Sequence, residues 1–293
     1  MSIVRAVCKC MERIAPLRFA EKWDNVGLLL ESPHIRPRAN RILLTIDLTP
    51  EVAEEALNTP TFCIIAYHPP LFKPLSSLTL NNPLQSTLLR CAAAGISVYS
   101  PHSALDSVTN GINDWLAEGC SIYVQDGNKK IYASQTSIVG ETFENGLGGQ
   151  GRMVTYAAPV SVKKVESMVK FWLKLDQIQV AYPAGLNPEE KNITSVALGA
   201  GSAGSLVASS NANVWVTGEM SHHEVLAAVA SGHVVILCGH TNTERGYLRR
   251  LARKLREEIA ADGENEVDPA VAQTLEGLEV VISEKDKHPL EFV

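Results

Sequence analysis

Residues 233–247, HVVILCGHTNTERGY, repeat a pattern that also occurs in residues 96–111, ISVYSPHSALDSVTNG. In each stretch a short apolar run ends, and a histidine and a carboxylate four positions apart follow at once. These pairs are His240 with Glu244 and His102 with Asp106. Short apolar runs rich in β-branched residues predict buried strands. The two stretches therefore predict two strands that each lead into a His-x-x-x-acid motif.

The sequence on both sides of these motifs alternates between apolar runs and helical stretches. Further predicted strands are RILLTIDL (41–48), FCIIAY (62–67), RMVTYA (152–157), QIQVAY, TSVALGAG, NVWVTGEM and LEVVISE. Strands this apolar need helices on both faces of their sheet. We therefore predict an α/β fold of two interlinked halves, residues 1–125 and 126–293, each with a mostly parallel core sheet and with a cleft between them. A short insert, about residues 121–192, connects the halves.

Two segments outside this alternation carry weaker signals. Residues 121–150, which include the glycine-rich NGLGGQG, predict a loop or a crossing segment. Near the C-terminus, the stretch from Glu244 to Ala261 predicts a long helix, and ADGENEVDPA after it predicts an acidic loop.

The N-terminal segment has two interpretations. Its basic residues and single acid are typical of a transit peptide. Its apolar spacing instead favours an amphipathic first helix. The buried side of that helix would hold Ile3, Val7, Cys10 and Ile14.

The composition excludes several classes of protein. The 293 residues carry a net charge of -6 without a basic block, so direct binding of nucleic acid is not expected. No apolar run approaches the length of a membrane-spanning helix, so no membrane partner is expected. The six cysteines form no C-x-x-C pair, which favours reduced thiols inside the cell. We predict a cytoplasmic protein, with mitochondria or the nucleus as alternatives.

Histidines and carboxylates gather where predicted strands end. They are His68, His102, Asp106, Glu219, His222, His223, His240 and Glu244. In parallel α/β sheets ligands bind beyond the carboxyl ends of the strands. One such histidine alone is usually an ordinary hydrogen-bonded residue, but several at equivalent strand ends indicate a metal site. Imidazole with carboxylate favours zinc, manganese or iron over calcium, and a carboxylate can bridge two ions.

The glycine-rich stretch Gly199-Ala-Gly-Ser-Ala-Gly204 follows a predicted strand and allows two interpretations. Its G-x-G-x-x-G pattern, with Glu219 at the next strand end, is typical of a dinucleotide site. The stretch after Gly204, SLVASSNAN, is short and polar for a crossover helix. A tight turn that offers backbone N–H groups to an anion or a substrate is therefore favoured.

Five motifs in order resemble a known family. WDNVGLLL, YHPPLFKPL, PHSALDSVTNGINDWL, TGEMSHHEV and GHTNTERGYL are together similar to the NGG-one-interacting factor three (Nif-three) family, also described as GTP cyclohydrolase I type 2. The spacing around SHHEVL and NTERG is similar to that of fungal members in particular. The resemblance implies a two-part α/β fold, a dinuclear metal centre between the parts and a ring-shaped homohexamer.

The resemblance also implies roles for residues within the motifs. The implied metal ligands are His68, Asp106, His240 and Glu244. His102 would act on the substrate or support the ligands, and the implied catalytic residues are His102 and His223. His223 and the Asp24-Asn25 turn would line the cleft. Bacterial members have His-His where this chain has Tyr67-His68, and a phenol is a poor ligand because its ordinary pKa is near 10.

Three functions remain as alternatives at this point. The leading hypothesis is a metal-dependent hydrolase that carries two divalent ions and acts on an unidentified small molecule. The second is a metal-binding protein without turnover. The third is an interaction protein, since the family name points to a transcriptional-adaptor partner. A cluster of metal ligands favours the first two, because an interaction surface alone needs no such cluster.

Overall fold

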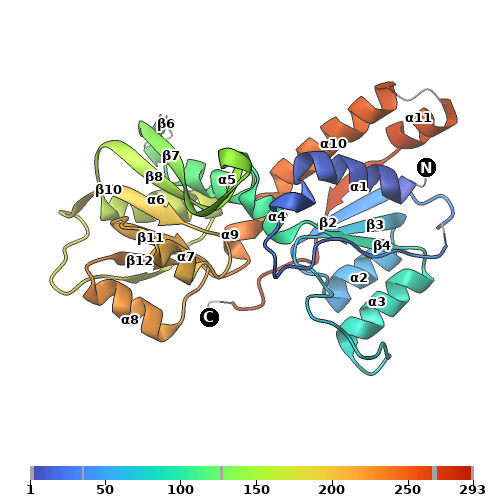
Figure 1. Ribbon diagram of the computed structural model, residues 1–293, viewed down its shortest axis with the longest axis horizontal. Helices are drawn as coiled ribbons and strands as arrows, with labels where there is room; N and C mark the ends of the chain where they lie inside the picture. Colours follow the sequence, from blue (N-terminus) through green and yellow to red (C-terminus); the bar gives the residue numbers. More distant parts are fainter. Residues whose placement is uncertain (1–2, 35, 126–127, 266–268, 292–293) are drawn as a thin grey trace. The chain divides into compact units, whose positions relative to one another are not determined.

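The computed structural model describes residues 3–34, 36–125, 128–265 and 269–291, and the chain forms two compact units (Figure 1). The first unit contains Met1–Leu105 and Tyr247–Lys287, and the second contains Asp106–Gly246 and His288–Val293. This division differs from the predicted boundary near residue 125. The reason is that the chain returns to the first unit near its end, where β13 (Glu279–Ile282) pairs with β2 (Arg41–Thr45).

The first unit is built on a five-stranded sheet with the order β1-β4-β3-β2-β13. Its further strands are β1 (Gly27–Leu30), β3 (Thr61–Ala66) and β4 (Ser97–Ser100). The pairs β4-β3, β3-β2 and β2-β13 are parallel, and only β1 runs antiparallel, to β4. All six residues of β3 are buried, as expected for a central parallel strand covered on both faces. The predicted mostly parallel sheet is confirmed in this unit.

Helices cover both faces of this sheet (Figure 1). α2 (Pro50–Leu57) and α3 (Pro83–Ala93) lie on one face, while α1 (Ile3–Ile14) and α10 (Leu248–Asn265) lie on the other. Thr49 begins α2, because its side chain accepts a hydrogen bond from the Val52 amide and a proline follows at the first helical position. The amphipathic first helix is confirmed, with its apolar side buried.

The predicted long helix from Glu244 is interrupted. α9 (Asn242–Arg245) ends before Gly246, and α10 starts only at Leu248. The expected acidic loop also begins later, since α10 continues through Asn265. Residues 266–268 lie outside the described residues, and α11 (Pro269–Glu276) follows them.

The second unit is built on a six-stranded sheet with the order β7-β8-β10-β11-β12-β9. Its strands are β7 (Ser134–Phe143), β8 (Gly148–Ser161), β9 (Gln179–Ala181), β10 (Asn192–Leu198), β11 (Val214–Thr217) and β12 (Val234–Leu237). Only β10-β11 and β11-β12 are parallel, so this sheet is mixed rather than mostly parallel. A separate hairpin pairs β5 (Ile122–Gln125) with β6 (Asn128–Ile131).

The glycine-rich NGLGGQG segment is not the expected loop. After the turn at Glu144–Gly146 it enters β8, and residues 121–150 contain four strands or strand starts. A Cβ on Gly149 would lie 2.3 Å from the Ile138 side chain, and one on Gly151 would lie 2.9 Å from the Leu198 carbonyl. These glycines therefore allow close packing between strands, which composition alone does not distinguish from a flexible loop.

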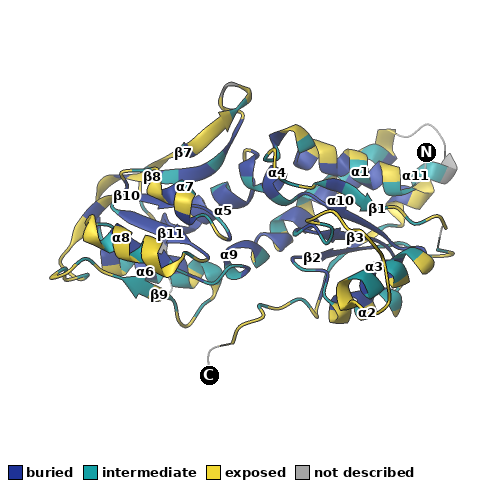
Figure 2. Ribbon diagram, turned by 60° about the horizontal axis from the view of Figure 1, so that its bottom comes forward, coloured by how far each residue is buried: buried dark blue, intermediate teal, exposed yellow. Residues whose placement is uncertain are grey.

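Side-chain alternation assigns the helices of the second unit to two faces. Ala197, Trp215 and Val235 point to one face and form a core with α7 (Gly204–Ala208) and α8 (His222–Ala230). Arg152 points to the opposite face, where it pairs with Asp114 of α5 (Ile112–Gly119) at 2.5 Å. α6 (Val162–Leu173) packs beside α5 on that face. Figure 2 shows central strands such as β3 and β11 as buried, whereas β7 at the edge of the second sheet is largely exposed.

Within the described residues, no helix combines the length and the apolar character that crossing a membrane requires. The longest helix, α10, carries charged residues along one side and buries Leu251, Leu255 and Ile259 along the other. It is therefore an amphipathic surface helix of the first unit.

Candidate metal centre

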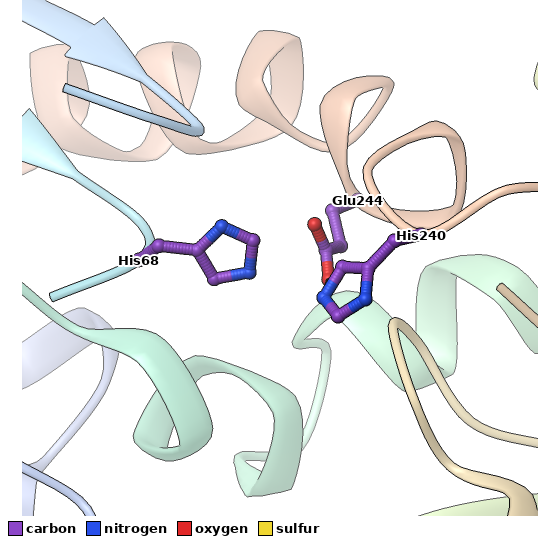
Figure 3. Close-up of side chains that lie close together, drawn as sticks. All are labelled: His68, His240 and Glu244. Atoms are coloured by element: carbon purple, nitrogen blue, oxygen red, sulfur yellow. The ribbon is translucent and has the colours of Figure 1, made fainter. Parts of the chain in front are cut away.

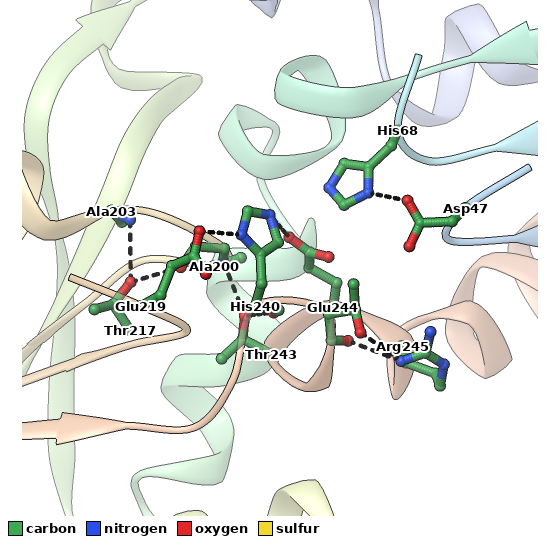
Figure 4. A network of polar contacts seen from close by, with 12 residues as sticks. Asp47, His68, Ala200, Ala203, Thr217, Glu219, His240, Thr243, Glu244 and Arg245 are labelled. Atoms are coloured by element: carbon green, nitrogen blue, oxygen red, sulfur yellow. Dashed lines mark hydrogen bonds and ion pairs between the residues drawn. The ribbon is translucent and has the colours of Figure 1, made fainter. Parts of the chain in front are cut away.

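His68 in the first unit follows β3 directly. The parallel ladder continues past the strands, because the Tyr67 amide donates to the Thr45 carbonyl and the His68 amide donates to the Ile46 carbonyl. This register aligns His68 with Asp47, and the His68 Nδ1 lies 2.9 Å from the Asp47 Oδ1 (Figure 4). A carboxylate that holds Nδ1 fixes the tautomer and leaves Nε2 as the ligand atom, which is the usual arrangement of a metal-binding histidine.

His102 also lies in the first unit, at the start of α4 (His102–Ser107). Its Nδ1 lies 2.8 Å from the Oδ1 of Asp24, whose side chain is 0% exposed. The other Asp24 oxygen accepts hydrogen bonds from the Ser103 amide and hydroxyl. Burial by itself raises the pKa of Asp24, but the hydrogen bonds from His102 and Ser103 outweigh it and lower that pKa. His102 has a φ of 29°, a strained conformation of the kind often found at functional sites.

His240 and Glu244 lie together in the second unit. His240 follows β12, and its Nδ1 lies 2.9 Å from the Oε1 of Glu219, which stands just after β11. Its Nε2 lies 3.3 Å from the Oε1 of Glu244, a side chain that is 1% exposed. The predicted His-x-x-x-acid geometry is therefore present here. It combines one imidazole nitrogen and one buried carboxylate oxygen, which suit zinc, manganese or iron.

Gly201 leaves room for this pair. Its φ is +62°, and a Cβ there would lie 2.7 Å from the Glu244 Oε1 and 2.9 Å from the His240 Nε2. Thr243 connects the two segments, because its hydroxyl accepts from the Gly201 amide and donates to the His240 carbonyl. A side chain at position 201 would occupy the space beside both candidate ligand atoms. The imidazole nitrogen and the carboxylate oxygen that face this space therefore fit a bound cation.

The prediction that the Gly199–Gly204 loop offers its backbone N–H groups to an anion is wrong for three amides, because each already donates to a side chain. The Ala200 amide donates to Asn113, the Gly201 amide to Thr243 and the Ala203 amide to Thr217, at 2.8 to 3.1 Å. The dinucleotide alternative also fails, because α7 has five residues and is too short for a crossover helix. The glycines instead bring the backbone close to His240 and Glu244.

Figure 3 draws three of the four predicted ligands: His240 and Glu244, which lie together in the second unit, and His68 of the first unit. The fourth, Asp106, is half-buried on α4. The predicted catalytic His223 is exposed at the start of α8, with its ring 5.5 Å from that of His222. The roles of Asp106, His102 and His223 stay predictions.

Sequence reasoning missed two residues of this arrangement. Asp47 stands at the end of RILLTIDL, and the strand-end rule that selected His68 could have found it. Thr243 gave no signal, because the Gly201 amide that donates to its hydroxyl lies 42 residues away in the sequence.

The strand–helix fold, with histidines and carboxylates at the strand ends, defines the chain as an α/β protein with a candidate metal site. Residues 2–274 match the family model Duf34/NIF3 (NGG1p interacting factor 3), and the chain belongs to this family. It is 41% identical to the NIF3 homolog of Schizosaccharomyces pombe, over 96% of this chain and 95% of that protein. It is 35% identical to the NGG1-interacting factor 3 of Saccharomyces cerevisiae, over 98% of this chain and 95% of that protein.

Solved structures confirm the α/β fold. A Bacillus cereus protein related to NIF3 superposes with a TM-score of 0.76 at 16% identity, over 99% of this chain and 98% of that one. Reduced HcgD from Methanocaldococcus jannaschii superposes with a TM-score of 0.70 at 20% identity, over 96% and 97% of the two chains. These identities are low, so the likeness concerns the fold.

Proposed function

We propose that this protein is a metal-dependent hydrolase that uses divalent ions at a dinuclear site. One observation carries the proposal: the two candidate ligand histidines, His68 and His240, each have Nδ1 fixed by a carboxylate. Asp47 holds the first and Glu219 holds the second, each at 2.9 Å. Such carboxylate partners orient metal-binding histidines and raise their basicity.

The ligands in this proposal are His68, Asp106, His240 and Glu244. The buried Glu244 carboxylate would repel a second carboxylate at the same site unless a cation or a proton compensated it. A divalent ion removes that cost, and a carboxylate of the set can bridge two ions. When bound, such ions polarise a carbonyl or phosphoryl oxygen and lower the pKa of water.

The residues of the chain itself would orient the substrate and move a proton. Asp24 holds the Nδ1 of His102, which leaves the His102 Nε2 to accept or donate a proton. Asp24 is thus a positioning residue, because it acts through the imidazole. The exposed His223 would contact the substrate from α8. The bond that is cleaved would be an amide, a C=N bond or a phosphoester.

Metal content measured by elemental analysis tests the proposal. Glu244→Ala and Asp106→Ala should each lower the divalent metal per chain by at least about tenfold, since each removes a ligand. The same preparations, screened for hydrolysis of small phosphoesters and amides, should lose activity together with the metal. Full metal occupancy in both variants would refute the ligand set, and metal without turnover on any substrate would refute the hydrolase.

A second function is supported by the name of a relative. The Saccharomyces cerevisiae relative is called NGG1-interacting factor 3, which favours an interaction with a transcriptional adaptor. In that case Asp106→Ala would lose metal and retain partner binding in a pull-down.

We also propose that the protein is a cytoplasmic homohexamer. A monomer in light scattering would refute this assembly.

A further inference from the structure

A cavity in the first unit lies outside the proposed ligand set. It is open to solvent, has a volume of about 640 Å³ and is lined by Trp23, Asn25 and the residues from Leu71 to Leu78. This volume falls within the range of about 300–1,000 Å³ that is typical of small-molecule sites. The lining segment joins β3 to α3, and Figure 2 shows it as exposed.

Large apolar side chains stand open to water around this cavity. Trp23 is 61% exposed and Phe72 is 48% exposed, and Leu75 and Leu78 beside them are also exposed. Such a contiguous group is costly to leave in water, and in folded proteins it commonly marks a binding site.

The aromatic rings form a continuous cluster that reaches His102. The Trp23 and Phe72 centroids lie 6.0 Å apart, and each lies within 6.2 Å of the His102 centroid. All three pairs are edge-to-face, which is a favourable arrangement of rings. A planar aromatic ring on Trp23 would extend this cluster and would lie beside the proposed proton-transfer residue.

The cavity is held in shape by the chain around it. The Asn25 side-chain amide donates to the Leu71 carbonyl, and the Thr79 amide donates to the Gln85 Oε1 at 2.9 Å. Pro74 restricts the backbone within the lining segment. A preformed site of this kind loses less conformational entropy when a ligand binds.

Lys73 supplies the charge of the cavity. It is exposed, lines the cavity, and makes no ion pair within residues 3–34, 36–125, 128–265 and 269–291. One lysine matches one anionic group rather than a polyphosphate. We propose that this cavity binds a small molecule that combines a planar aromatic ring with a single anionic substituent. The inference extends the proposed function by giving the chemical class of the substrate, and it rests on that function only for turnover.

The test measures binding of 1-naphthoate to the full chain after its metal has been removed with a chelator. This probe has one ring system and one charge and cannot be hydrolysed. Calorimetry should detect binding, while cyclohexanecarboxylate, which lacks the aromatic ring, should bind at least about tenfold more weakly. The neutral 1-naphthamide should bind about threefold more weakly than 1-naphthoate, the size expected of an exposed ion pair.

Variants locate the binding. Trp23→Ala should weaken 1-naphthoate about tenfold, and Trp23→Phe should restore most of the affinity, because it retains a ring. Lys73→Gln should weaken 1-naphthoate about threefold and leave 1-naphthamide unchanged. Leu80→Ala is the matched control, because Leu80 is 70% exposed in the same segment and does not line the cavity.

Several results would overturn the inference. Equal binding of 1-naphthoate and cyclohexanecarboxylate would, and so would an unchanged affinity in Trp23→Ala. Absence of binding, together with a lower mass of Leu78→Asp in light scattering, would show that a second copy of the chain covers the cavity. Metal-dependent hydrolysis without 1-naphthoate binding would refute this inference alone. Binding in a protein that never retains metal would refute the proposed function and leave the cavity as a site.

Discussion

The parallel strands β2-β3-β4 of the first unit and β10-β11-β12 of the second lead into functional residues at corresponding places, but the residues differ. In strand order, they are Asp47, His68 and His102 in the first unit and Gly201, Glu219 and His240 in the second. In the first unit Asp47, which follows β2, holds the Nδ1 of His68, which follows β3. In the second unit Glu219, which follows β11, holds the Nδ1 of His240, which follows β12.

The difference teaches what a strand end determines and what it does not. The carboxyl end of a parallel strand brings a residue to the site. The residue on the neighbouring strand then decides which histidine nitrogen remains available. Where the first unit has Asp47, the second has Gly201, and the missing side chain leaves room for the buried Glu244. The two units can therefore be probed by exchanging the features in which they differ.

The largest effect is expected for Gly201→Ala. The new Cβ would lie 2.7 Å from the Glu244 Oε1 and 2.9 Å from the His240 Nε2, so both side chains must move. A displacement of about 1 Å at an active site can lower the reaction rate about 100-fold. By analogy, we expect metal affinity to fall about 100-fold, which a competition titration measures. Gly185→Ala is the matched control. Its φ of +76° imposes the same backbone strain, but nothing lies within 4 Å. Equal losses in both variants would contradict the role given to Gly201.

The next effect concerns the carboxylates that hold the histidines. Asp47→Asn and Glu219→Gln should each lower metal affinity by about 10- to 100-fold, the usual cost of removing such a partner. The loss should be larger for Asp47, because the Glu219 side chain is 57% exposed and water can replace it. Isothermal titration with zinc measures both. A larger loss in Glu219→Gln would reverse the comparison between the units.

Asp24→Asn should lower the free energy of unfolding. The Asp24 carboxylate accepts hydrogen bonds from His102 and Ser103, and charged hydrogen bonds of this kind contribute about 2 kcal/mol. Because folding lowers the pKa of Asp24, its contribution is fully present above its unfolded pKa, near 3.8, and is lost as the pH falls through the lower folded value. Calorimetric melting of wild type and variant should therefore differ most at neutral pH and converge below about pH 4. A difference that grows toward acid would have the wrong sign.

Sequence patterns predicted the parts of the fold that depend on local signals. The apolar runs gave the α/β class and most strands of the first unit, because a buried parallel strand is apolar on both faces. The mixed second sheet was not predicted, since the glycines of β8 serve close contacts with Ile138 on β7 and with Leu198 on β10, which composition does not reveal. The same limit applies to the site. His68, His240 and Glu244 came from motifs, whereas Thr243 and the close approach of Gly201 depend on packing.

The smallest effect is expected for Tyr67→Phe, which tests whether the residue before His68 contributes to the site. The Tyr67 side chain is buried, and its ring lies 4.9 Å from that of His68. Phenylalanine preserves this ring contact and removes only the hydroxyl. A phenol with an ordinary pKa near 10 stays protonated at neutral pH and binds metal weakly, so metal content should change by less than about twofold. Elemental analysis measures the metal content of Tyr67→Phe. His68→Ala, which should lose most of its metal, is the reference for a lost ligand. If Tyr67→Phe lost as much metal as His68→Ala, the phenolate would be a ligand, and the first unit would supply two adjacent donors to the site.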